Sequence, residues 1–173
     1  MAELEIRALA HDAATVQALA GILAETVAAG GSVHFMDPVP LDQAQAYWRE
    51  ALAAAQDGGR IVLGAHLDGR LAGTVTLFLD TPPNQPFRAE IWKLMTAPWA
   101  RRRGLARALM IAAERLAAER GRTLLNLDTA VDGGAAELYD SLGWTRAGVI
   151  PDYAYKPQGG LTGTAIYWKR LDL

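Results

Sequence analysis

The sequence has 173 residues, of which 51% are hydrophobic and 21% are charged, a composition typical of a globular protein. At this length we expect one domain, residues 1–173, with a single core. Seventeen Lys and Arg residues stand against nineteen Asp and Glu residues, and the resulting net charge of −2 argues against a nucleic-acid partner. There is no cysteine, which excludes disulfides and thiol nucleophiles.

Membrane and metal partners are also not expected. No apolar run reaches the roughly 18 residues that a membrane span needs. The first residues include Glu3 and Glu5 and lack the charge order of an export signal, which predicts a cytoplasmic protein. The sequence contains no H-E-x-x-H motif and no carboxylate cluster at ligand spacing, so we predict no metal.

The chain begins with a predicted strand and two predicted helices. The strand is expected over Glu3–Ala8. Asp12 can cap the first helix, which the glycine pair Gly30–Gly31 ends. The second helix is expected to start at Asp42 and to end at the glycine pair Gly58–Gly59. Both helices show apolar residues at helical spacing, so each should bury one side.

A hairpin follows the two helices. The β-rich runs Arg60–His66 and Leu71–Leu79 are joined through Asp68-Gly69, which is the strongest short-range hairpin signal. Residues 81–86 contain three prolines and therefore form a loop. The remaining elements are expected as a strand over Ala89–Met95, a helix over Leu105–Ala118, a strand over Thr123–Thr129, a helix over Ala135–Leu142, and a strand pair over Trp144–Ile150 and Gly163–Leu171.

This order of elements predicts an α/β fold. Alternation of strand and helix in the second half favours parallel pairing, whereas the hairpin requires antiparallel pairing. We therefore expect a mixed central sheet with helices on both faces.

An arginine-rich turn, Arg101–Gly104, leads into the third predicted helix. N–H groups at a helix start have no partner within the helix, and the helix dipole favours an anion there. Small residues at Gly104 and Ala106 let an anion approach the backbone, and the arginines add positive charge. We interpret the turn as a pyrophosphate cradle; the alternative is a solvated surface run. Its spacing matches neither a P-loop nor G-x-G-x-x-G.

Arg101-x-x-Gly104-x-Ala106 resembles the Q/R-x-x-G-x-G/A motif of the GCN5-related N-acetyltransferase (GNAT) superfamily, which cradles the pyrophosphate of acetyl-CoA. The order of elements and residues 135–144 are similar as well. Residues 31–36, 88–95, 127–129 and 164–169 resemble the tabtoxin-resistance acetyltransferases in particular. The resemblance implies a single-domain GNAT fold with a mostly antiparallel sheet. It also implies acetyl-CoA as co-substrate and a small amine, amino-acid-like or antibiotic-like, as acceptor.

The resemblance assigns cofactor-binding roles to two segments. The backbone of Leu94 and Met95 would pair with the pantetheine arm, and the Met95 N–H would polarise the thioester carbonyl. The pyrophosphate would be bound by the turn and the helix start, residues Arg101, Arg102, Arg103, Gly104, Leu105, Ala106 and Arg107. Asp132 stands where the superfamily often has an asparagine, which puts an amide contact to the cofactor in doubt.

Tyr139 is the first candidate catalytic residue. It matches the superfamily tyrosine that points at the sulfur of acetyl-CoA. A phenol there could give a proton or a hydrogen bond to the leaving thiolate. The alternative is a packing role, because Leu138, Tyr139 and Leu142 could all face the core of an amphipathic helix.

Two carboxylates are candidates for the acceptor site. Strand alternation places Glu90 and Trp92 on one face and Lys93 on the other. Carboxylates within covered strands are costly to bury without partners, so Glu90 and Asp128 are candidates for a substrate pocket. Both match acidic residues implicated in substrate binding and proton abstraction in tabtoxin-resistance enzymes. The alternative is that each lies solvated or salt-bridged at a strand end.

His34 and Trp92 are further candidates to line the acceptor site, although His34 could be an ordinary loop residue. Because no cysteine can carry the acetyl group, we expect direct attack in a ternary complex. Two other functions stay open: a non-catalytic acyl-CoA-binding sensor, and a protein N-terminal or lysine acetyltransferase. The resemblance also allows a homodimer.

Overall fold

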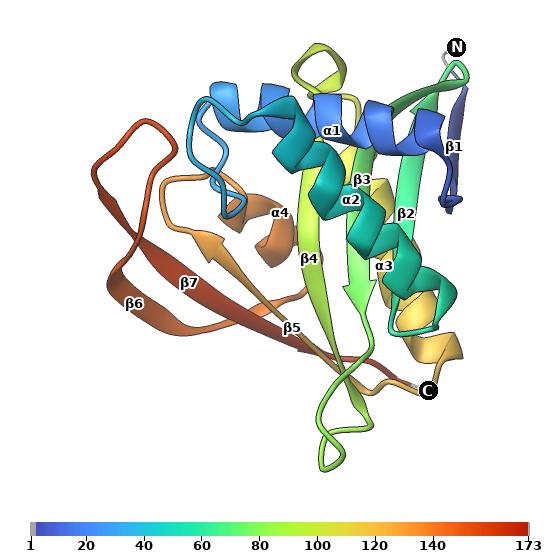
Figure 1. Cartoon of the computed structure of the whole chain (residues 1–173). Coiled ribbons are helices and arrows are strands. Elements are labelled where there is room, and N and C mark those ends of the chain that lie inside the picture. Colours follow the sequence, from blue (N-terminus) through green and yellow to red (C-terminus); the bar gives the residue numbers. More distant parts are fainter. Residues whose placement is uncertain (1–2, 173) are drawn as a thin grey trace.

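Residues 3–172, which the computed structural model describes, form a seven-stranded sheet with helices on both faces (Figure 1). The strands are β1 (Leu4–Ala8), β2 (Arg60–Leu67), β3 (Arg70–Phe78), β4 (Arg88–Thr96), β5 (Leu124–Ala130), β6 (Thr145–Tyr155) and β7 (Leu161–Arg170). The helices are α1 (Ala13–Ala28), α2 (Leu41–Gln56), α3 (Leu105–Glu119), α4 (Ala136–Ser141) and the short 3-10 helix η1 (Pro98–Ala100).

The strand order is β1-β2-β3-β4-β5-β7-β6. Among the described strands, β4 and β5 form a parallel pair and every other neighbouring pair is antiparallel. The parallel pair needs a crossover connection, which α3 provides. The α/β fold with a mixed, mostly antiparallel sheet is therefore confirmed.

The helices pack on the sheet as their apolar stripes predict. In Figure 1, α1 and α2 lie on one side of β2, β3 and β4, and α3 lies on the other. The Asp12 side chain caps α1 by accepting a 2.8 Å hydrogen bond from the Thr15 N–H. The second helix starts one residue earlier than predicted, so Asp42 lies in its first turn. No helix within residues 3–172 combines the length and apolarity needed to traverse a lipid bilayer.

The turn between β2 and β3 has the predicted hairpin geometry. Both of its central residues have positive φ, 50° at Asp68 and 79° at Gly69. This is the pattern of a type I′ turn, whose twist matches that of the flanking strands.

The sheet splits between β4 and β5. The two strands pair only over Arg88–Glu90 and Leu124–Asn126, after which they diverge (Figure 1). Residues 91–96 of β4 and 127–130 of β5 therefore face a gap between the strands. This gap positions the candidate site.

The C-terminal hairpin is longer than predicted. The predicted strand ends at Ile150, but residues 151–155 continue β6. A proline is tolerated at Pro151 because β6 is an edge strand and because its pairing with β7 is interrupted by a register shift between Ile150 and Ala154. The hairpin tip reaches the end of α1, where the Gln158 side chain donates a 3.1 Å hydrogen bond to the Val27 carbonyl.

Candidate functional site

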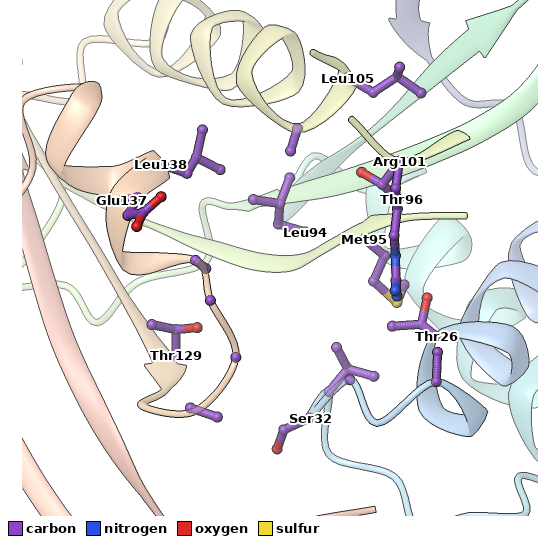
Figure 2. Close-up of a pocket in the computed structure, with 18 of the residues that line it drawn as sticks. Thr26, Ser32, Leu94, Met95, Thr96, Arg101, Leu105, Thr129, Glu137 and Leu138 are labelled. Carbon is purple, nitrogen blue, oxygen red and sulfur yellow. The ribbon is translucent and has the colours of Figure 1, made fainter. Parts of the chain in front are cut away.

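A cleft of about 820 Å³ occupies the gap between β4 and β5. Figure 2 shows Leu94 and Met95 of β4 on one border, Thr129 of β5 with Leu138 of α4 on another, and Thr26 at the end of α1. A cavity of this size falls within the range of sites that hold cofactors and drug-sized ligands.

The arginine-rich turn forms one end of the cleft. Arg101, Arg102 and residues 104–107 line it, whereas Arg103 does not. Arg102 and Gly104 have φ values of 61° and 78°. A Cβ added at Gly104 would meet no heavy atom within 4 Å. The turn therefore requires a glycine for its left-handed backbone, and the open space beside Gly104 leaves room for the close approach of an anion, which stays a prediction.

Tyr139 lies where the cleft meets a second cavity. Its side chain is only 5% exposed, and burial raises the pKa of its phenol to about 12. The neighbouring Thr129 side chain acts on this pKa in the opposite direction, through a hydrogen bond. Because this pKa is far above 7, the phenol is protonated at neutral pH and can donate a hydrogen bond.

The second cavity, called here the side cavity, opens beside Tyr139. It is lined by residues 32–34, residues 91–94 of β4, residues 127–129 of β5 and Tyr139. Three predicted acceptor-site residues, His34, Trp92 and Asp128, are thus brought together. Asp128 accepts a 2.9 Å hydrogen bond from the Thr164 hydroxyl of the neighbouring strand.

Lys93 lines the same side cavity, although strand alternation placed it on the face opposite Trp92. The cause is a β-bulge: Trp92 pairs with Thr76 and Met95 pairs with Thr74, so β4 has one more residue than β3 between these pairs. Lys93 has a φ of 52° within this bulge. The prediction that Lys93 lies on the face opposite Trp92 was therefore wrong.

The Lys93 ammonium contacts His34. Lys93 Nζ lies 2.8 Å from His34 Nδ1. Burial lowers the pKa of Lys93 to about 8, and the nearby Asp128 carboxylate opposes this shift. Burial, and then the charge of Lys93, also lowers the pKa of His34, so its imidazole is neutral at pH 7.

Glu90 lies outside both cavities. Arg88 donates a hydrogen bond to its Oε1, and the Trp92 indole N–H donates a 2.8 Å bond to its Oε2. The expectation that Glu90 borders the acceptor pocket therefore does not hold in this geometry. The neighbouring strand β3 also holds Trp92 in place, because the Trp92 ring stacks on Phe78 at a centroid distance of 4.2 Å.

Asp132 lines the cleft and pairs with Lys156 of the C-terminal hairpin at 2.9 Å. The hydrogen bond from Lys156 is the main cause that lowers the pKa of Asp132. The pair joins the β5–α4 loop to the hairpin tip. Among residues 3–172, no group of three or more His, Asp or Glu side chains is arranged to hold a metal ion.

Sequence reasoning did not assign Lys93 or Thr129 to the site. Thr129 directly follows Asp128 and lines both cavities, so its position in β5 was a usable signal. For Lys93 no such signal existed, because the alternation of apolar and polar residues in a strand does not reveal a bulge at a lysine.

Comparison with known proteins identifies the class. The model of the Acetyltransferase (GNAT) family matches residues 31–144, which include the cradle turn, Asp128 and Tyr139. The chain therefore belongs to the GNAT family of acetyltransferase enzymes.

Individual relatives agree with this family. An uncharacterized N-acetyltransferase from the hisH-hisA intergenic region of Azospirillum brasilense is 35% identical over 106 residues, 60% of this chain. The match spans 61% of that relative's length.

Solved structures share the fold. An N-acetyltransferase from Staphylococcus aureus has a TM-score of 0.83 at 19% identity and covers 98% of this chain and 99% of its own. YncA from Salmonella typhimurium, solved with its cofactor acetyl-CoA, has a TM-score of 0.80 at 21% identity, over 98% of this chain and 94% of its own.

Proposed function

We propose that this chain is an acetyl-CoA-dependent N-acetyltransferase that passes the acetyl group to a small amine by direct attack in a ternary complex. The observation that carries the proposal is the arrangement of the two cavities. The arginine-rich turn and the buried phenol of Tyr139 both line the cleft. The same phenol borders the side cavity, which is also lined by the Asp128 carboxylate. A thioester and an amine could thus meet beside Tyr139.

We propose that the diphosphate of acetyl-CoA binds at the arginine-rich turn, Arg101–Gly104 (the cradle turn). Arg101, Arg102 and the free N–H groups at the start of α3 would bind the diphosphate of acetyl-CoA. The backbone of Leu94 and Met95 borders the cleft beyond the last β4–β5 pair. The pantetheine arm would lie there as an added strand, and the Met95 N–H would face the thioester carbonyl.

Asp128 is the proposed binder of the acceptor ammonium and its proton acceptor. It borders the side cavity and has a hydroxyl donor, Thr164, that holds one carboxylate oxygen in place. Loss of a proton gives a neutral amine, which forms the C–N bond while the C–S bond breaks and CoA leaves as thiolate. Glu90 has donors on both oxygens, and its catalytic role stays a prediction.

Tyr139 would stabilise the leaving thiolate. A thiol has a pKa of about 8.5, so full proton transfer from a phenol of pKa about 12 is uphill by roughly 4–5 kcal/mol. Tyr139 is therefore proposed to donate a hydrogen bond to the sulfur, while the proton that completes the thiol comes from water or from the acceptor nitrogen.

The side cavity, of about 100 Å³, suits a small acceptor. The deciding experiment measures thiol release from acetyl-CoA with a panel of small amines, and with peptides that present an N-terminus or a lysine. Release with small amines supports the proposal. Turnover of peptides alone would favour a protein acetyltransferase, and CoA binding without any release would favour the sensor. A cytoplasmic location, a homodimer and a role in antibiotic resistance stay predictions.

A further inference from the structure

The side cavity is lined by one cation and one anion that form no direct ion pair with each other. Lys93 and Asp128 both line it, on the two strands that diverge. None of the ion pairs among residues 3–172 includes either residue. Lys93 is half-buried and Asp128 is exposed at the border of the cavity, and a partly buried ammonium normally pairs with an anion or with a ligand.

Lys93 is held in place by groups that leave its charge available. Its Nζ is 2.8 Å from His34 Nδ1 and lies 5.3 Å from the ring centroid of Tyr47 and 6.0 Å from that of Phe35. A neutral imidazole and two aromatic rings orient an ammonium without cancelling its charge. The remaining donor capacity of Lys93 is therefore free for an anion in the cavity.

The backbone at this contact is strained on both sides. His34 and Lys93 have φ values of 73° and 52°, in the left-handed region that side-chain-bearing residues rarely adopt. Strain of this kind persists where the surrounding structure enforces it, and it is concentrated at binding and catalytic sites. A lysine needed only for solubility would require neither the bulge nor the burial.

We propose that the side cavity selects an acceptor that carries a carboxylate as well as its amine, with Lys93 binding the carboxylate and Asp128 the ammonium. This inference rests on the proposed function and names its class of acceptor, a small amino acid. His34 assists in this arrangement. Because its Nδ1 accepts from Lys93, its Nε2 carries the hydrogen and is a second donor for the same carboxylate.

The test compares each of several small amino acids with its carboxamide and with its decarboxylated amine, using kcat/KM from thiol release. The wild-type protein should prefer the acid over the amide by at least about tenfold, the usual effect of one charged hydrogen bond. Lys93→Met should lower kcat/KM for the acid by at least about tenfold and leave the amide within about twofold. Lys93→Arg should keep part of the preference.

Arg49→Met provides the matched control. Arg49 is an exposed cation on α2, and its side chain donates a hydrogen bond to Gln45 of the same helix. This variant should leave both acceptors unchanged. Equal wild-type rates on acid and amide would overturn the inference. So would a Lys93→Met protein that loses acid and amide turnover by the same factor, since that is the result of general damage to the site.

A binding measurement separates this inference from the proposed function. Calorimetric titration of the CoA-loaded protein with an acid and with its amide reports recognition without turnover. Absence of thiol release with every acceptor would contradict the proposed function. In that case tighter binding of the acid, lost in Lys93→Met, would still support the carboxylate site, and equal binding of acid and amide would contradict it.

Discussion

The indole N–H of Trp144 donates a 2.8 Å hydrogen bond to Glu114, joining the segment after α4 to the middle of α3. The second oxygen of Glu114 accepts a 2.7 Å bond from Lys169 of β7, whose Nζ also donates to the Leu142 carbonyl at 2.6 Å. These contacts fix the end of the helix that carries Tyr139. The position of the phenol therefore depends on a polar cluster at the C-terminal end of α4.

Glu114→Ala should destabilise the protein by about 3–5 kcal/mol, because Lys169 would be left without its carboxylate in a poorly solvated site. Glu119→Ala is the matched control on the same helix. It removes an exposed i,i+4 pair with Arg115 and should cost about 0.5 kcal/mol or less. Denaturant unfolding measures both changes, and similar losses in the two variants would contradict the assigned role of the cluster.

Tyr139→Phe should lower kcat by at least about tenfold and leave the affinity for CoA unchanged. The phenylalanine fills the same space but cannot donate a hydrogen bond to the thiolate. Thiol release gives kcat, and calorimetry with CoA shows whether the cleft is intact. Full turnover by this variant would remove the role assigned to the phenol.

Asp128→Asn should lower kcat/KM for the amine by a factor on the order of 10²–10⁴ and should change the shape of the pH profile. The amide keeps the size of the side chain but neither attracts the ammonium nor takes its proton. Glu90→Gln should have a smaller effect, because Glu90 lies outside the side cavity and is connected to it by the hydrogen bond from Trp92. If neither substitution changes turnover or its pH dependence, the acidic-pocket hypothesis is wrong.

Gly104→Ala should weaken CoA binding and destabilise the fold by about 1–2 kcal/mol, the cost of a left-handed backbone for a residue with a Cβ. Gly58 is a matched position after α2, with a φ of 82° and open space around its own added Cβ. Gly58→Ala should cost a similar free energy but leave the affinity for CoA unchanged. Calorimetry and thermal unfolding of both variants separate backbone strain from the loss of the cradle.

Lys93→Met should stabilise the protein near pH 7. Burial lowers the pKa of Lys93 from 10.5 to about 8, so between these pH values the unfolded chain binds a proton that the folded protein does not. The stability of the wild-type protein should therefore rise by up to about 3 kcal/mol, relative to Lys93→Met, as the pH increases from about 8 to 10.5. The unfolding free energies of both proteins, measured across this pH range, test the prediction. Parallel curves of stability against pH would contradict it.

Local signals predicted most of the fold. The apolar stripe of α1, the Asp12 cap and the Asp68-Gly69 turn each determine a nearby piece of backbone, and each appears in the structure as predicted. The predicted strand ends at Ile150, directly before Pro151, whereas β6 continues to Tyr155. Whether a proline breaks a strand depends on whether that strand lies at the edge of the sheet, which is a property of the whole fold.

The candidate site could be predicted most completely where a motif fixes the backbone. The residues of the cradle turn line the cleft apart from Arg103, because the start of a helix determines where they face. Lys93 and Glu90 were misplaced for a different reason. The bulge in β4 and the Arg88 and Trp92 donors around Glu90 arise from pairing with other strands, which no local pattern encodes.

The short pairing between β4 and β5 has a mechanical consequence. The sheet consists of two parts, the half-sheets β1–β4 and β5–β7, joined by one three-residue seam at Arg88–Glu90. Lys93 belongs to the first half-sheet and Asp128 to the second, both beyond the seam. A slight tilt of one half-sheet against the other changes the spacing of these two charges, so the sheet itself sets how long a molecule can bridge them.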